Sequence, residues 1–267
     1  MSPTARTRLD QLLVDRGLAE TRSRAQALVL AGRVRVGAGD AGRSGVKPGD
    51  LVPADVPVAL EARLPYVSRG GEKLAAALDA FAVDSAGLVC LDAGASTGGF
   101  SDCLLQRGAF RVHAVDVGRG QLAATLASDP RVVVHDRVNA RALSPDLLGV
   151  LVDLAVVDVS FISLGLVLGP IASCVRPGGR IVALVKPQFE AGRGQAPRGV
   201  VRDPSVHQAV LERIVSIAAG LGLEPRDVTA SPLLGPAGNR EFFLLAGVGE
   251  TTGGAADLAA RIAAVTA

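Results

Sequence analysis

The sequence predicts an α/β fold built on a mostly parallel sheet, preceded by a small α+β domain. Seven short apolar runs alternate with helical segments over residues 89–246, as expected when helices connect the strands of one sheet. Several runs end in a charged side chain, which is typical of the carboxyl edge of an open α/β sheet. Residues before about 60 lack this alternation, and positive charge is concentrated in residues 1–47. The strands are expected at residues 89–92, 111–116, 132–135, 152–157, 180–185, 228–230 and 241–246, and helices between them at residues 100–107, 164–174 and 205–219.

The chain is expected to divide into two domains joined by a short linker. A length of 267 residues accommodates one large and one small domain. Residues 1–60 form the small domain, residues 61–67 the linker and residues 68–267 the large domain. In the small domain, Ser23 is positioned to cap a second short helix, which leads to a strand at residues 34–36.

Composition argues against several classes of protein. The net charge is only +2, so a nucleic-acid site requires a local concentration of charge. The three cysteines have no metal-ligand spacing and cannot all pair, which predicts buried core thiols, no metal site and a reducing, cytoplasmic setting. The first residues lack the apolar core of a signal peptide. The longest uncharged run, residues 159–175, is interrupted by glycine and proline and is too short to span a membrane.

Lysine is rare in this chain. Of 28 basic residues only three, Lys47, Lys73 and Lys186, are lysines. A guanidinium does not lose its proton in a protein, whereas an amine can. Each lysine is therefore a candidate for a role that arginine cannot fill. For Lys73, expected in the first turn of a helix, the alternative is an ordinary surface lysine.

A glycine-rich turn follows the first strand of the large domain, at Asp92-Ala-Gly-Ala-Ser-Thr-Gly-Gly-Phe100. A dinucleotide site has the spacing Gly-x-Gly-x-x-Gly, and a carboxylate at the tip of the strand would repel a pyrophosphate. A ligand with positive groups and no phosphate fits better, and S-adenosylmethionine carries an ammonium and a sulfonium. The alternative is a turn that only begins a helix.

Further polar residues follow the later strands at the same edge. Asp116 lies 24 residues after Asp92, where an acid can hold ribose hydroxyls. The loop from Asp136 to Asn139 is placed to meet an adenine, with an ordinary polar connection as the alternative. The expected cofactor-binding residues are Asp92, Gly94, Ser96, Thr97, Gly98, Gly99, Phe100, Asp116, Asp136, Asn139 and Asp158.

Two consecutive strands place Asp158 and Lys186 at their carboxyl ends. Ligands of open α/β sheets bind at this edge, so both groups lie where a substrate must arrive. The alternative is a buried salt bridge without a chemical role. Glu241 opens the last strand, and an isolated acid there is more often a strand-edge charge.

The small domain concentrates positive charge. Residues 1–47 contain nine basic and four acidic residues, a net charge of +5. Such a patch suits RNA phosphates, and the alternative is a solvated basic face. The stretch from Arg8 to Val36, with Leu-Asp-x-Leu-Leu-Val-x-Arg-Gly-Leu-Ala, Ser-Arg-x-x-Ala and Ala-Gly-Arg-Val-Arg-Val, resembles the RNA-binding module of bacterial small-subunit ribosomal protein four. The expected RNA-binding residues are Arg6, Arg8, Arg22, Arg24, Arg33, Arg35 and Arg69.

Motifs along most of the chain resemble the TlyA family, whose members are described both as haemolysins and as rRNA methyltransferases. These motifs are Tyr66-Val-Ser-Arg-Gly-Gly-x-Lys-Leu74, the turn at Asp92–Phe100, Asp116-Val-Gly, Asp158-Val-Ser-Phe-Ile-Ser163, Lys186-Pro-Gln-Phe-Glu190 and Gly238-Asn-Arg-Glu241. Some members carry tryptophan in the linker, where this chain offers only Tyr66. The family is similar to the FtsJ-type 2'-O-methyltransferases with a Rossmann-like fold, whose Lys-Asp-Lys-Glu tetrad matches Lys73, Asp158, Lys186 and Glu241.

The resemblance implies S-adenosylmethionine-dependent methylation of cytidine ribose in ribosomal RNA. Some members act on the large subunit only and others on both subunits. The basic extension before Leu9 and the tail after the last strand favour the second type.

Ribose methylation needs a base, because a ribose hydroxyl is too weak an acid to ionise at pH 7. We expect Lys186 to accept the proton, with Lys73 favouring the neutral amine and orienting the ribose. Asp158 and Glu241 are expected to position the two amines.

Two other functions are alternatives to methyl transfer. A membrane-active haemolysin would release the contents of liposomes, and an RNA-binding protein with an inactive methyltransferase fold would transfer no methyl group.

Overall fold

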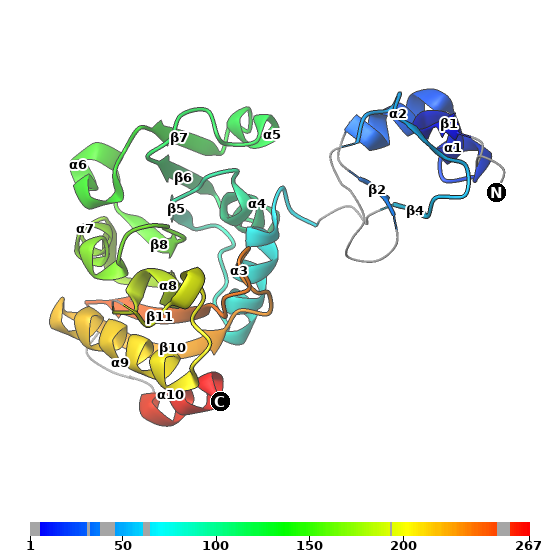
Figure 1. Ribbon diagram of the computed structural model, residues 1–267. Coiled ribbons are helices and arrows are strands. Elements are labelled where there is room, and N and C mark those ends of the chain that lie inside the picture. Colours follow the sequence, from blue (N-terminus) through cyan, green and yellow to red (C-terminus); the bar gives the residue numbers. More distant parts are fainter. Residues whose placement is uncertain (1–5, 31–32, 38–45, 61–64, 193, 250–256) are drawn as a thin grey trace. The chain divides into compact units, whose positions relative to one another are not determined.

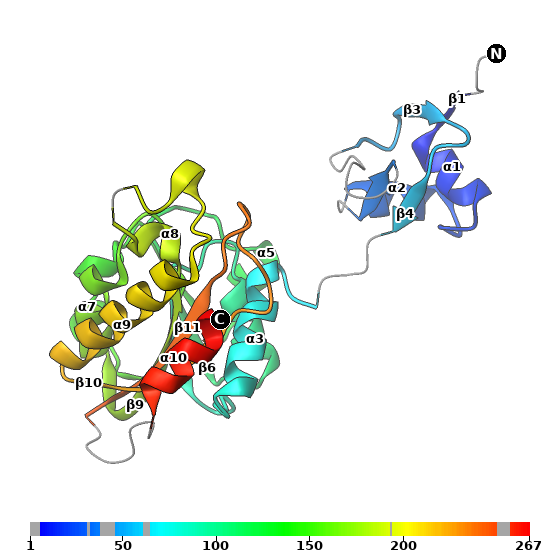
Figure 2. The ribbon, with the colours of Figure 1, turned by 60° about the horizontal axis from the view of Figure 1, so that its bottom comes forward.

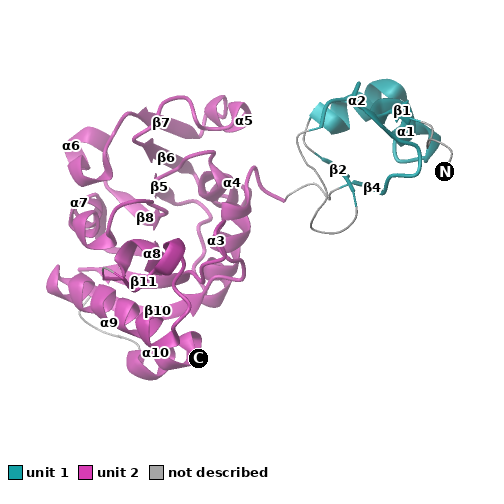
Figure 3. Cartoon of the chain, viewed as in Figure 1, with its two compact units in different colours: residues 1–64 teal, residues 65–267 magenta. Residues whose placement is uncertain are grey.

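A computed structural model of the chain describes residues 6–30, 33–37, 46–60, 65–192, 194–249 and 257–267. The chain forms two compact units, residues 1–64 and residues 65–267 (Figure 3). Residues 61–64 of the predicted linker lie outside the described residues.

Unit 1 is a small α+β structure in which two helices pack against two short antiparallel strand pairs. Its elements are β1 (Arg6–Arg8), α1 (Leu9–Asp15), α2 (Arg22–Leu30), β2 (Val34–Val36), β3 (Leu51–Pro53) and β4 (Val58–Leu60). Strand β1 pairs with β3, and β2 pairs with β4. Leucine and valine side chains from both helices, including Leu9, Leu13 and Val29, form its buried core. The expected cap Ser23 lies inside α2 instead, and Thr21 Oγ1 accepts the amide of Arg24 at 3.1 Å.

Unit 2 contains a seven-stranded sheet in the order β10-β11-β9-β8-β5-β6-β7 (Figure 1). Its strands are β5 (Val89–Ala93), β6 (Arg111–Asp116), β7 (Val132–Asp136), β8 (Val152–Val157), β9 (Val175–Val185), β10 (Leu223–Ala230) and β11 (Phe242–Val248). All neighbouring pairs are parallel except those that involve β11. The predicted α/β class, with a mostly parallel sheet, is therefore confirmed.

Helices cover both faces of the sheet (Figure 1), as expected when crossovers connect parallel strands. One face packs against α3 (Arg69–Ala80) and α4 (Gly99–Gln106), and the other against α7 (Leu168–Ser173) and α9 (Pro204–Gly220). Successive strand residues alternate between the two apolar cores: Cys90 and Val182 face α3 and α4, whereas Leu91 and Ile181 face α7 and α9. The remaining helices are α5 (Ala124–Ala127), α6 (Pro145–Leu148), α8 (Pro187–Glu190) and α10 (Leu258–Thr266), with 3-10 turns at Ala140–Ala142, Leu164–Leu166 and Pro197–Gly199.

Several element boundaries differ from the expected ones. Helix α3 begins at Arg69, so Lys73 lies in its second turn, and its side chain is buried rather than on the surface. Strand β9 begins at Val175, five residues earlier than expected. The alanine-rich tail forms α10, which Asp257 caps by accepting the amide of Ala260 at 2.9 Å. Figure 2 shows α10 beside α9 and close to β10.

The three cysteines are buried and unpaired, which confirms their prediction as core residues. Within the described ranges, no helix is both long enough and apolar enough to cross a membrane.

Candidate active site

The turn after β5 needs glycine at Gly94 for two reasons. Its φ angle of +90° lies in the left-handed region. A Cβ atom at this position would also lie 2.3 Å from the carbonyl oxygen of Asp158, which follows the neighbouring strand β8. The close approach of the two chain segments therefore depends on the missing side chain.

The next two glycines of the turn serve packing. A Cβ atom on Gly98 would lie 2.4 Å from the Leu126 side chain, and one on Gly99 would lie 2.2 Å from Ser68 Oγ. Both glycines and Phe100 are buried, and the Phe100 ring lies 6.1 Å from that of Phe243 in the core. These three predicted cofactor residues thus hold the start of α4 against its neighbours.

An open pocket of about 560 Å³ lies at the carboxyl edge of the sheet. Five of the predicted cofactor residues line it: Gly94, Ser96, Asp116, Asn139 and Asp158. Gln121 and Arg141, which no motif included, line it as well. Phe161 and Ile162 also line it; they belong to the motif at residues 158–163 but were not predicted as site residues. Thr97 is exposed beside the turn, and exposed Asp136 accepts the amide of Gly120 at 3.0 Å; neither is among the lining residues.

Backbone amides hold the Asp116 carboxylate at the end of β6. One oxygen accepts the amide of Ser96 at 2.8 Å, and the other accepts that of Gly118 at 2.7 Å. Each carboxylate oxygen has more than one acceptor site, so both can still accept a hydrogen bond from a hydroxyl group of a ligand. Asp116 is therefore a fixed acceptor on the wall of the pocket.

Asp92, the first residue of the predicted turn motif, is fully buried and does not line the pocket. One of its oxygens accepts Ser101 Oγ–H at 2.7 Å, and the other has no hydrogen-bond partner among the described residues. Burial away from water raises the pKa of Asp92 to about 7, and the nearby carboxylates of Asp158 and Asp116 act in the same direction. Near neutral pH this group is only partly ionised.

The first of two lysine–carboxylate pairs joins the ends of β8 and β9. Lys186 follows the last residue of β9, and its Nζ forms an ion pair with Asp158 Oδ1. The same Nζ donates to Ser160 Oγ at 2.8 Å. Because Asp158 also lines the pocket, this pair lies at the pocket wall.

The second pair lies next to the first along the sheet edge. Lys73 Nζ in α3 donates to Glu241 Oε2 at 2.5 Å, and both side chains are buried. Glu241 immediately precedes Phe242 of β11, which pairs with Val185 of β9. Opposed residues of an antiparallel pair have Cα atoms about 5 Å apart, so Glu241 and Lys186 leave neighbouring strands side by side. All four residues of the predicted tetrad are thereby brought to one region.

The aromatic rings of Phe161 and Phe189 lie near this region and were not among the predicted site residues. Phe161 is 90% exposed and has a φ angle of +63°, which is rare for a residue with a side chain. Its ring lies 5.0 Å from that of Phe189, next to the first turn after Lys186. Both rings belong to motifs quoted above, at residues 158–163 and 186–190. Aromatic residues are rare in this chain, so two of them inside these motifs could have indicated a role at the site.

Glu190, also missed, ties together the segments that leave β8 and β9. Its buried carboxylate accepts Ser163 Oγ–H at 2.8 Å and the amide of Leu164 at 2.7 Å. Arg213 of α9 donates to the same carboxylate at 3.0 Å. The loop that begins at Asp158 is therefore fixed to α8, which begins directly after Lys186.

The predicted RNA-binding arginines have different surroundings. Arg8 and Arg22 both contact Asp10, and Arg6 donates to the carbonyl of Leu51 at 3.0 Å. The side chain of Arg24 is exposed on α2. Arg33 and Arg35 each have an interaction partner. In unit 2, Arg69 donates to the carbonyl of Leu234 at 2.8 Å, which links α3 to the loop before β11.

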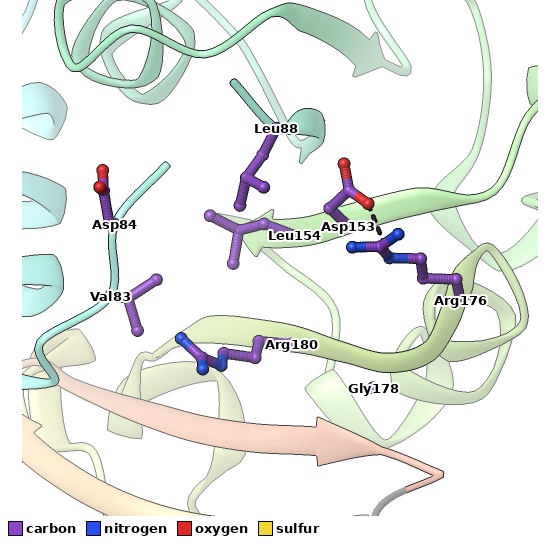
Figure 4. Close-up of a pocket in the computed structure, with 8 residues that line it drawn as sticks. All are labelled: Val83, Asp84, Leu88, Asp153, Leu154, Arg176, Gly178 and Arg180. Carbon is purple, nitrogen blue, oxygen red and sulfur yellow. Dashed lines mark ion pairs between the residues drawn. The ribbon is translucent and has the colours of Figure 1, made fainter. Parts of the chain in front are cut away.

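A second pocket lies at the opposite, amino-terminal edge of the sheet (Figure 4). Arg176 and Asp153 form an ion pair of 2.7 Å in its wall, and Arg180 extends toward Val83 and Asp84. None of the predicted site residues lines this second pocket. Within the described part of the chain, no group of three or more His, Cys, Asp or Glu side chains is arranged to hold a metal ion.

Comparison with known proteins agrees with this arrangement. Residues 66–248 match the FtsJ-like methyltransferase family, and residues 7–37 match the S4 domain. The chain is 50% identical over 242 residues to the 16S/23S rRNA (cytidine-2'-O)-methyltransferase TlyA of Mycobacterium tuberculosis, covering 90% of this chain and 89% of the relative. It is 37% identical to Hemolysin A of Brachyspira hyodysenteriae, covering 88% of this chain and 98% of that protein.

A solved structure of a hemolysin-named protein from Streptococcus thermophilus is similar over both units. It is 40% identical, has a TM-score of 0.74, and the match covers 99% of this chain and 95% of that one. The S4 match precedes the FtsJ-like match in the chain, and the similarity to these relatives extends over both. The chain therefore belongs to the TlyA family, which joins an amino-terminal S4 domain to an FtsJ-like methyltransferase domain.

Proposed function

We propose that this chain transfers a methyl group from S-adenosylmethionine to the 2'-hydroxyl of cytidine in ribosomal RNA. The observation that carries this proposal is the pair of lysine–carboxylate contacts, Lys186–Asp158 and Lys73–Glu241, at the edge of the sheet where the open pocket lies. The name of the M. tuberculosis relative, which specifies 16S and 23S rRNA, supports substrates from both ribosomal subunits.

The pocket residues fit S-adenosylmethionine, which supplies an electrophilic methyl group when bound. Carboxylates at Asp116 and Asp158 suit a ligand with an ammonium and a sulfonium, and amide-held Asp116 suits ribose hydroxyls. Apolar Val115 and Ile162, together with the Asn139 amide, offer contacts for an adenine. In this proposal Asp92 acts indirectly, through its hydrogen bond to Ser101 in α4, the helix that follows the turn.

Lys186 is proposed as the general base. The ion-paired ammonium first releases a proton to water. The neutral amine, still held by Asp158 and Ser160, is then placed to receive the proton of the ribose 2'-hydroxyl as the oxygen bonds to the methyl carbon and the sulfur–methyl bond breaks. An arginine in this place could not accept a proton. S-adenosylhomocysteine and the methylated ribose are the products, and Lys186 returns the proton to water.

Lys73 and Glu241 are proposed to orient the ribose. The hydrogen bond to Glu241 fixes the Lys73 ammonium in a buried position. The positive charge of Lys73 is therefore held in one place. A fixed positive charge stabilises negative charge that develops on the attacking oxygen. This division of roles requires a group that can accept a proton at Lys186 and a fixed positive charge at Lys73.

Unit 1 is proposed to bind ribosomal RNA. The S4 match over residues 7–37 and the net charge of +5 over residues 1–47 support this role. Unit 1 would deliver phosphate contacts, while unit 2 would perform methyl transfer. Cytoplasmic location follows from this substrate as part of the proposal.

Transfer of a labelled methyl group from S-adenosylmethionine to isolated ribosomal subunits tests the proposal. We expect labelled RNA with the wild-type chain and with Arg176→Ala, which changes only the opposite edge of the sheet. No label is expected with Lys186→Ala. Unlabelled RNA with the wild-type chain would overturn the proposal and favour an RNA-binding protein with an inactive methyltransferase fold.

A further inference from the structure

Unit 1 contains a buried carboxylate that holds two exposed arginines. Asp10, in the first turn of α1, has no exposed surface. It accepts hydrogen bonds from Arg8 Nε at 3.0 Å, Arg8 Nη2 at 2.9 Å, Arg22 Nε at 3.0 Å and Gln26 Nε2 at 2.9 Å. These donors come from β1 and α2, so one carboxylate joins three elements of the unit.

The contact with Asp10 occupies only some of the N–H donors of Arg8 and Arg22. A guanidinium has five N–H donors. Within the described part of the chain, Arg8 donates two of these N–H groups to Asp10 and Arg22 donates one, so three and four respectively are not used by Asp10. Their side chains remain 45% and 52% exposed, whereas Asp10 is fully covered. Two cations balanced by one anion leave the cluster with a net charge of +1.

Such a cluster is suited to an anion with several oxygen atoms, such as a planar carboxylate or a tetrahedral phosphate. Guanidinium groups recognise phosphate through paired hydrogen bonds, and groups that are already fixed lose less conformational freedom on binding. The surrounding sequence is basic, with a net charge of +5 over residues 1–47. A polyanion with regularly spaced phosphates, such as an RNA backbone, fits both features.

We propose that Asp10 is a positioning residue that holds Arg8 and Arg22 as a phosphate-binding fork for the RNA backbone. The fork is defined by these three residues. Asp10 does not touch RNA, because Arg8 and Arg22 cover it. The inference rests on the proposed RNA-binding function of unit 1 and assigns a role to a buried acid inside a basic surface.

This role makes a prediction opposite to that of simple electrostatics. Removing an acid from an RNA-binding surface should strengthen binding, because it removes repulsion of the phosphates. Asp10→Asn should instead weaken binding, because an amide group cannot hold two guanidinium groups in place. Asp15→Asn is the matched control, since Asp15 is exposed on the same helix and contacts only Gln11, at 2.8 Å, among the described residues.

The experiment measures binding of the full chain to a fragment of ribosomal RNA by fluorescence anisotropy at several salt concentrations. We expect Asp10→Asn to weaken binding about tenfold at 0.1 M salt and to reduce the salt slope by about one to two phosphate contacts. Asp15→Asn should bind as tightly as the wild type or more tightly. Equal behaviour of the two variants would overturn the inference.

A double-mutant cycle separates positioning from a structural effect. In a chain that already carries Arg8→Gln and Arg22→Gln, Asp10→Asn should cause no further loss of affinity. An equal further loss would show that Asp10 supports only the fold of unit 1, and would overturn the inference. If Asp10→Asn alone unfolds unit 1 by circular dichroism, Arg22→Lys replaces it, because lysine keeps the charge but lacks the Nε donor; wild-type affinity and salt slope in that variant would overturn the inference.

The same measurement distinguishes this inference from the proposed function. If the wild-type chain binds RNA no better than a chain without residues 1–60, the RNA-binding role of unit 1 fails and the inference fails with it. If the wild type binds and Asp10→Asn binds equally well, only the inference fails. Competition by an oligoglutamate peptide as effective as that by RNA would identify an acidic protein segment as the ligand, and would overturn the assignment to phosphate.

Discussion

Lys73 Nζ lies 2.5 Å from Glu241 Oε2, although 168 positions separate the two residues in the chain. Only 10% of the Lys73 side chain and 1% of the Glu241 side chain are exposed. The pair thus connects α3 to the start of β11, and both side chains are largely shielded from solvent. Breaking one half of such a pair leaves a buried charge without compensation.

Glu241→Ala should therefore lower the free energy of unfolding by about 3–5 kcal/mol and abolish methyl transfer. The double variant Lys73→Met with Glu241→Leu should recover most of the stability, because no uncompensated charge remains. It should still be inactive, since the proposed orienting ammonium is gone. Urea denaturation and a methyl-transfer assay measure the two effects. Activity in the stable double variant would exclude a chemical role for this pair.

Lys186→Arg should abolish methyl transfer while cofactor affinity stays within about threefold of the wild type. Arginine keeps the positive charge beside Asp158 but does not act as a base at neutral pH. Calorimetric titration with S-adenosylhomocysteine and a single-turnover assay separate binding from chemistry. Appreciable turnover by this variant would show that the positive charge alone suffices.

Gly94→Ala should weaken binding of S-adenosylhomocysteine at least tenfold and destabilise unit 2 by about 1–3 kcal/mol, because it combines a left-handed φ with a clash against the Asp158 carbonyl. Gly120→Ala is the matched control. Its φ of +62° is also left-handed, but a Cβ atom there meets no atom within 4 Å. The control should lose some stability and keep its ligand affinity. Equal affinities in both variants would argue against a ligand next to Gly94.

Asp92 should make stability depend on pH in a defined direction. Its pKa is raised from 3.8 to about 7, so between these values the folded chain binds more protons than the unfolded chain. This group therefore lowers stability as pH rises through that window. Burial and neighbouring positive charge lower the pKa of His113 to about 4, which acts in the opposite direction below pH 6.5.

Comparison of the wild type with Asp92→Asn isolates the effect of Asp92, since His113 is present in both. From pH 5 to pH 8, the stability of Asp92→Asn relative to the wild type should rise by about 2–3 kcal/mol. Urea denaturation at the two pH values gives this difference. A relative stability that does not change with pH would mean that Asp92 titrates at its ordinary value.

Local patterns in the sequence predicted the elements that position the site. Apolar runs such as those at residues 111–116 and 152–157 coincide with β6 and β8, because interior parallel strands must be apolar on both faces. Charged residues directly after such strands, Asp158 and Lys186, were predicted to meet at one edge, and they do. The family motif identified Lys73 and Glu241 as partners in the same tetrad.

Features that depend on three-dimensional packing were not predictable from local patterns. The depth of Asp92 depends on Ser101 and on the helix above it, so a carboxylate that resembled a ligand contact is a buried group. Phe100 completes the turn motif in sequence but belongs to the core. The Glu190 carboxylate accepts the amide of Leu164, 26 positions away, and the fork around Asp10 joins β1 to α2. These contacts depend on how the elements pack, and sequence spacing did not predict them.

The identity of the methylated nucleoside tests the central claim most directly. Ribosomal RNA incubated with the wild-type chain and S-adenosylmethionine is digested to nucleosides and analysed by mass spectrometry, with the Lys186→Arg variant as the control. We predict 2'-O-methylcytidine, with the methyl group on the sugar fragment, and none in the control. A methyl group on a base, or no added methyl group in the presence of the wild-type chain, would contradict the account.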